Sequence, residues 1–183
     1  MKRQTLCNSS TTRHSFGKTH HSQDMKRQER SIRLHTDAGT HYVWLGGSCD
    51  YAHKERAGGG AYAIEKDGKT IGTFATSACG TTEFRMMLTA MVHAMNALEA
   101  GSTIVFLTNV AYLTNFDKPP ADGSPNADLT RECAAAKARH KTVKVKVLPY
   151  HKFSQLQAMH ELAHNAMTEA RKRNSSANEG EQK

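Results

Sequence analysis

The sequence has no long apolar segment, no closely paired cysteines and a deficit of acidic residues. Its apolar runs are too short to cross a bilayer, and no basic start is followed by an apolar core, so we expect neither a membrane span nor a secretory signal. No C-x-x-C pair is present, and a chain of 183 residues does not need disulfides to fold. We therefore expect a cytoplasmic protein with reduced thiols at Cys7, Cys49, Cys79 and Cys133.

The shortage of acids leaves a strongly basic chain. Lys and Arg number 25 against 17 Asp and Glu, which gives a formal net charge of +8 and a pI near 9.4. A surplus of this size favours polyanionic partners, with nucleic acid first among them. The same charge also serves solubility alone, so a protein partner stays open as an alternative to nucleic acid.

Composition divides the chain into three parts. Residues 1–38 are basic and rich in Ser, Thr and His, with almost nothing to bury, so we expect them to be disordered on their own. Residues 39–172 carry the periodic apolar patterns of one folded domain. Residues 173–183 form a polar tail.

The first half of the folded part predicts three strands and a helix. Residues 40–49 contain a short apolar strand, and 58–78 contain two strands joined at Asp67-Gly68, a strong hairpin signal. A helix with apolar residues at helical spacing follows and stops at Gly101. Its apolar positions are Phe84, Met87, Leu88, Met91, Met95 and Leu98.

The second half alternates strands with helices. The order of elements, βββαβαβα, predicts an α/β fold with a mixed five-stranded sheet and helices on both faces. The predicted elements are a buried strand at 102–109, a short helix at 110–116, a helix at 127–140 capped by Asn126, a strand at 142–150 and a long helix at 153–173.

Six short segments follow one another between residues 44 and 167. They are WLGGSC (44–49), GGAYAI (59–64), TTEFRMMLTAMVHAM (81–95), FLTNVAYL (106–113), NADL (126–129) and HELAHNAM (160–167). In this order and spacing they resemble the ribonuclease H type I family, whose first strand carries T-D-G-S-C and whose last helix carries D-E-L-A. The resemblance covers residues 41–170 and implies a ribonuclease H-like fold and cleavage of the RNA strand of RNA–DNA hybrids.

The resemblance also implies a catalytic site that this chain lacks. Cleavage in the family uses two Mg²⁺ ions held by four carboxylates, and Mg²⁺ takes hard oxygen ligands. The matching positions here are Gly46, Met87, Asn109 and His160, which carry no formal negative charge. Without that charge, two divalent ions at close range repel each other. We therefore predict a protein with no catalytic carboxylates, no cofactor and no two-metal hydrolysis.

Residues 160–164 read H-E-L-A-H, which on a helix places two imidazoles one turn apart, as in zinc metalloproteases. No third ligand follows at the required spacing, and the resemblance explains the motif as D-E-L-A with His in place of Asp. His151 lies in PYHKF (149–153), which resembles the loop where the family places a mobile catalytic His, and this implies a position at the edge of the site. A zinc site of His151, His160 and His164 is a weaker alternative, because no carboxylate or Cys completes a tetrahedral shell.

The favoured hypothesis is a ribonuclease H-like domain without hydrolytic activity that binds nucleic acid, either RNA–DNA hybrid or another polyanion, or a protein partner. An active enzyme is the first alternative, with Mg²⁺ or Mn²⁺ on oxygens of Asp37, Asp50, Glu83 and Asn109. A protein-interaction scaffold that never touches nucleic acid is the second. Candidate phosphate contacts are Lys137, Arg139, Lys141, Lys144, Lys146, Arg171, Lys172 and Arg173.

Overall fold

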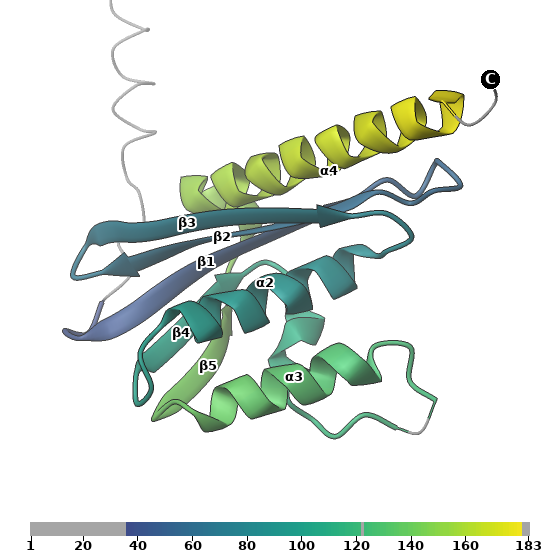
Figure 1. Cartoon of the computed structure of the whole chain (residues 1–183). Helices are drawn as coiled ribbons and strands as arrows, with labels where there is room; N and C mark the ends of the chain where they lie inside the picture. The colour runs from purple at the N-terminus through teal and green to yellow at the C-terminus, as the bar shows by residue number, and fades with distance from the viewer. Residues whose placement is uncertain (1–35, 122, 181–183) are drawn as a thin grey trace, which may run out of the picture. The chain divides into compact units, whose positions relative to one another are not determined.

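The computed structural model describes residues 36–121 and 123–180, and its strands form a single mixed sheet (Figure 1). The strands are β1 (Thr40–Cys49), β2 (Gly58–Lys66), β3 (Lys69–Ala78), β4 (Thr103–Thr108) and β5 (Thr142–Val147). They lie in the order β3-β2-β1-β4-β5. The first three are antiparallel, whereas β4 runs parallel to β1 and β5 runs parallel to β4. The predicted α/β class and five-stranded mixed sheet are therefore confirmed.

Helices cover both faces of this sheet (Figure 1). They are α2 (Glu83–Ala97), α3 (Ala127–Ala138) and α4 (Ser154–Gly180), joined by the 3-10 turns η1 (Ala111–Asn115) and η2 (Tyr150–Lys152). The helices α2 and α3 pack on one face, and α4 packs on the other. In the part of the chain that is described, none of these helices has the length and apolar character needed to cross a membrane.

The last helix extends further than the sequence predicted, whereas the first strand begins close to the predicted domain boundary. The helix α4 continues to Gly180, so residues 173–180 of the expected polar tail are helical. The sheet begins at Thr40, close to the expected boundary at residue 39. Of the N-terminal segment expected to be disordered, residues 1–35 lie outside the described residues, as does Cys7.

The strand β1 has a core on each side because its side chains alternate between the two faces. Val43 and Leu45 are fully buried and belong to the larger cluster, which includes Met87 of α2. Tyr42 and Trp44 point the other way and join the cluster under α4. This double burial fits the position of β1 as the central strand, between the helices of the two faces.

The hairpin between β2 and β3 forms where the sequence predicts it. Asp67 and Gly68 have φ angles of 51° and 74°, so both central residues of the turn are left-handed. That conformation suits a two-residue turn between twisted strands, and glycine adopts it without steric cost. The hairpin extends the sheet beyond β1 and gives α4 a wider surface on which to pack.

Glycines in β1 and β2 allow the helices to approach the sheet closely. On the α2 face, a Cβ atom added to Gly60 would lie 2.3 Å from the carbonyl oxygen of Met86. On the α4 face, a Cβ atom added to Gly59 would lie 2.0 Å from the carbonyl oxygen of Ala163. Real Cβ atoms do not come so near, so the two helix backbones rest directly on the strand backbone at these positions.

Candidate nucleic-acid interface

A cavity of about 240 Å³ opens at the carboxyl ends of the parallel strands β1 and β4. Ligands in α/β folds characteristically bind at such strand ends. The first turn of α2, the start of η2 and the first half of α4 complete its wall. The lining residues are Gly46, Gly47, Glu83, Asn109, Tyr150 and His160.

Three of the four positions that match the family's carboxylates meet in this cavity. They are Gly46, Asn109 and His160, whereas Met87 does not line it. Met87 is completely buried beneath Gly47, where a Cβ atom on the glycine would lie 2.6 Å from its Cγ. Glu83, one helical turn earlier, supplies the only carboxylate among the lining residues.

Gly46 offers no side-chain ligand, and there is also no space for a side chain at this position. A Cβ atom built on Gly46 would lie 2.5 Å from the carbonyl carbon of Met159 and 2.6 Å from the backbone nitrogen of His160. The backbone of α4 therefore fills the space that a side chain at this position would need. An aspartate cannot be accommodated there unless the helix moves.

The ring of His160 is held against β1. Its Nδ1 lies 2.9 Å from the carbonyl oxygen of Gly47, and because that oxygen can only accept, Nδ1 carries the proton. The ring of Tyr150 lies nearly perpendicular to it at a centroid distance of 5.9 Å. These two contacts fix the ring orientation and leave Nε2 of His160 to interact with a ligand.

Glu83 is partly buried and sits beside two tyrosines. Burial raises the pKa of its carboxyl group, and the nearby charge of His160 partly offsets that rise. The backbone N–H of Glu83 donates to the hydroxyl oxygen of Tyr51 at 3.2 Å. Burial, together with the charges of Glu83 and Tyr51, raises the pKa of Tyr112 to about 12. Tyr112 lies within FLTNVAYL, a segment that carries the family resemblance, but the sequence predicted no role for it or for Tyr51.

The four residues of the alternative active site do not meet at one point. Asp50 is turned toward the loop after β1, where its Oδ2 lies 2.7 Å from Nδ1 of His53 and 2.9 Å from Nη1 of Arg171. Asp37 precedes the other end of β1, and its N–H donates to the hydroxyl of Tyr42. Only Glu83 and Asn109 of that set share the cavity.

The three histidines of the zinc alternative also remain apart. His164 has Nδ1 3.5 Å from Oγ of Ser48, and His151 contacts the ring of Tyr150 at a centroid distance of 5.3 Å. Within residues 36–121 and 123–180, no three His, Cys, Asp or Glu side chains are grouped so as to hold a metal ion. H-E-L-A-H therefore orients His160 and His164 toward β1, each with a separate partner.

Comparison with solved structures places this geometry in a known fold. The ribonuclease H1 of Halobacterium salinarum NRC-1 matches with a TM-score of 0.59 and 11% identity over 72% of this chain and 100% of that one. LC9-RNase H1, described as a type 1 enzyme with the type 2 active-site motif, matches with a TM-score of 0.62 and 20% identity over 74% and 75%. LC11-RNase H1, solved in complex with RNA/DNA hybrid, matches with a TM-score of 0.59 and 13% identity over 72% and 99%.

The chain has the ribonuclease H fold. No family model and no curated protein matches its sequence. The resemblance seen in six short segments is thus confirmed at the level of the fold, although identity to these structures does not exceed 20%.

On this ribonuclease H fold, the predicted phosphate contacts lie at the end of α3, on and just before β5, and on the second half of α4. Lys144 and Lys146 are exposed on the edge strand β5, and Lys141 is exposed just before it. Five of the eight have acidic or polar partners, and none lines the cavity. The pairs are Lys137 with Asp117, Arg139 with Asn96, Arg171 with Asp50, Lys172 with Glu169 and Arg173 with Ser77.

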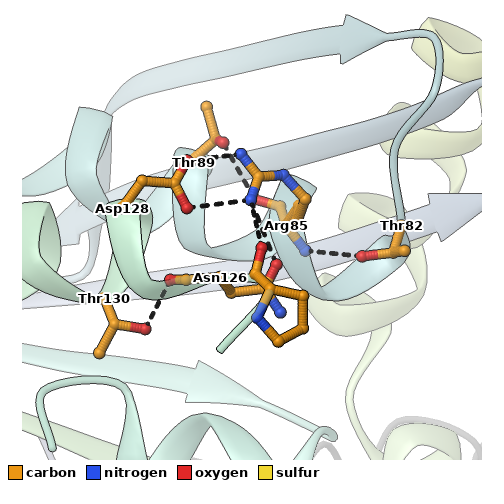
Figure 2. A network of polar contacts seen from close by, with 7 residues as sticks. Thr82, Arg85, Thr89, Asn126, Asp128 and Thr130 are labelled. Atoms are coloured by element: carbon orange, nitrogen blue, oxygen red, sulfur yellow. Dashed lines mark hydrogen bonds and ion pairs between the residues drawn. The ribbon is translucent and has the colours of Figure 1, made fainter. Parts of the chain in front are cut away.

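Arg85 fixes the first turn of α2, which carries Glu83, against the start of α3 (Figure 2). Its guanidinium donates to both carboxylate oxygens of Asp128, at 3.0 and 2.7 Å, and to Oδ1 of Asn126 at 3.3 Å. Asn126 occupies the predicted N-cap position of α3, but its side chain makes no capping hydrogen bond there. The side chain of Asn126 accepts from Arg85 instead, so it ties two helices together.

Proposed function

We propose that this chain is a ribonuclease H-fold protein that binds nucleic acid and does not perform two-metal hydrolysis. The observation that carries the proposal is the packing of the α4 backbone against Gly46, in a cavity lined by a single carboxylate, Glu83. Two Mg²⁺ ions need several oxygen ligands and compensating negative charge to sit close together. The residues present do not fit that pair of ions, so no hydrolytic step is assigned to them.

Support for nucleic acid as the partner comes from charge and from the cavity. The chain carries a formal net charge of +8. Asn109, Tyr150 and His160 offer the neutral or cationic hydrogen-bonding groups that contact phosphates and bases. A solved protein of the same fold, LC11-RNase H1, is in complex with RNA/DNA hybrid. A net positive charge, together with a cavity lined by a single carboxylate, suits retention of a polyanion rather than its hydrolysis.

Binding and cleavage measured on the same substrates test this proposal. Full-length protein is titrated into labelled RNA–DNA hybrid, duplex DNA and single-stranded RNA at several salt concentrations, and hybrid cleavage is followed with Mg²⁺ and with Mn²⁺. We expect saturable binding of nucleic acid at moderate salt, and hybrid that stays intact with either metal. Cleavage abolished by a chelator would contradict the loss of activity. Affinity that vanishes at moderate salt for all three substrates would instead indicate a protein partner.

A further inference from the structure

Two exposed tyrosines lie together at the first turn of α2. Tyr51 and Tyr112 are 60% and 47% exposed, and among described residues only Ile71 and Val147 are comparably large and apolar at the surface. The hydroxyl of Tyr51 accepts from the Glu83 N–H at 3.2 Å. The ring of Tyr112 meets that of the next residue, Phe84, edge to face at 4.8 Å. Both rings are thus anchored at the first turn of α2, whose Glu83 lines the cavity, although neither tyrosine lines it.

The cavity beside these tyrosines contains hydrogen-bonding groups suited to the edge of a base. Glu83 offers a carboxylate that only accepts hydrogen bonds when ionised, and Asn109 offers both a donor and an acceptor. The Nδ1 of His160 is occupied by Gly47, which leaves Nε2 for the ligand. Stacking faces next to a polar cavity are the arrangement by which proteins bind unpaired bases.

We propose that this surface, formed by Tyr51, Tyr112 and the cavity lined by Glu83, binds an unpaired nucleobase of a single strand and favours guanine. This inference rests on the proposed function and specifies its substrate. A base stacks on the tyrosine faces and directs its Watson–Crick edge toward Glu83. In a hybrid or duplex that edge is already paired, so single strands bind better than either.

The preference among bases follows from their donors. Guanine presents two neighbouring donors, N1–H and the exocyclic amine, which the two carboxylate oxygens of Glu83 can accept together. Uracil presents one N–H between two carbonyl oxygens, and those oxygens repel a carboxylate. Adenine and cytosine each offer an amine without the second donor, so they fall between guanine and uracil.

The test uses the full chain and short labelled RNAs of equal length. One probe is all uridine, a second has a single central guanosine, and a third is the guanosine probe paired with complementary DNA. Fluorescence anisotropy gives the affinities. We expect the guanosine strand to bind about tenfold more tightly than the uridine strand, and more tightly than its hybrid.

Variants show whether these residues are responsible. Tyr51→Ala and Tyr112→Ala should each weaken binding of the guanosine strand about tenfold, because one stacking face is lost. Tyr112→Phe should retain most of the affinity, since its ring remains, and Glu83→Gln should remove the preference for guanosine. Ile71→Ala, at an equally exposed apolar position on β3, is the matched control and should change nothing. Thermal unfolding of each variant identifies any that fail to fold.

The outcomes separate this inference from the proposed function. If no nucleic acid binds at moderate salt, the proposed function itself fails. If nucleic acid binds but the tyrosine variants behave like Ile71→Ala, only the base-binding site is refuted. Equal affinity for the guanosine and uridine strands, or tighter binding of the hybrid, would refute it as well.

Discussion

Asp50 follows the cavity residues Gly46 and Gly47 by a few positions in the chain, but its carboxylate does not line the cavity. Its side chain is only 9% exposed and contacts both His53 and Arg171. The hydrogen bond from His53, supported by that from Arg171, lowers the pKa of Asp50 to about 2. The carboxylate therefore joins the loop after β1 to α4, and it has no free oxygen directed at the strand ends.

This contact predicts a change of stability with pH. Because the pKa of Asp50 falls from 3.8 to about 2 on folding, its ionised form stabilises the fold above pH 4. That contribution is lost as pH falls from about 4 to about 2. Urea unfolding of the wild type and Asp50→Asn should differ at pH 5, and the difference should shrink toward pH 2.5.

Glu161→Gln, at an exposed acid on α4, serves as the control for this pH series. We expect its unfolding free energy to follow that of the wild type at every pH. A difference between wild type and Asp50→Asn that stays constant from pH 5 to pH 2.5 would contradict the assigned pairing.

For single residues, the sequence predicted which of them lie together at the site better than it predicted how deeply each is buried. Gly46, Asn109 and His160 were matched to one site by their place in motifs, and they do share a cavity. Met87 was matched by the same means but faces the core, because its spacing also fits the apolar stripe of α2. The partly buried state of Glu83 could not be predicted, since it depends on how the first turn of α2 meets α4 and η1.

Among the elements, the close approach of α4 to β1 decides what the cavity can hold. The helix backbone lies where a side chain on Gly46 would have to be. Glycines inside a strand often mark such an approach. The G-G and G-G-G runs in β1 and β2 were therefore a usable signal, although the sequence alone does not say which helix comes close.

This packing predicts different costs for the same substitution at two strand glycines. Gly46→Ala should lower the free energy of unfolding by about 1–3 kcal/mol, because its Cβ would overlap the α4 backbone. Gly72→Ala on β3 should be nearly neutral, since nothing lies within 4 Å of a Cβ there. Urea denaturation measures both variants. Equal unfolding free energies for the two would contradict the helix position.

The order of elements was predictable because each has a local signal, and so was the start of the last helix, but its carboxyl end was not. The left-handed turn at Asp67 and Gly68 and the period of apolar residues in α2 are encoded in neighbouring residues. The extension of α4 beyond residue 173 was missed because its polar sequence resembles a frayed tail. Helix continuation there is compatible with polar residues, since Arg173 reaches Ser77 on β3.

Over the whole molecule, the net positive charge does not correspond to one concentrated basic surface. The chain carries +8, yet five of the eight basic residues predicted to contact phosphates have partners, and the group is divided among α3, β5 and α4. The cavity has a single carboxylate, Glu83, and two exposed tyrosines lie beside that residue. Under the proposed function, this distribution would favour contacts to bases over contacts from a dense basic surface to phosphates.

The loss of the paired-metal site is the central claim, and metal binding tests it most directly. Full-length protein is titrated with Mn²⁺, and bound ion is followed by electron paramagnetic resonance, with Glu83→Gln measured alongside. We predict no saturable binding of two ions at millimolar Mn²⁺, because a single carboxylate cannot balance their repulsion. Two Mn²⁺ ions bound per chain, with at least one lost in Glu83→Gln, would contradict the account.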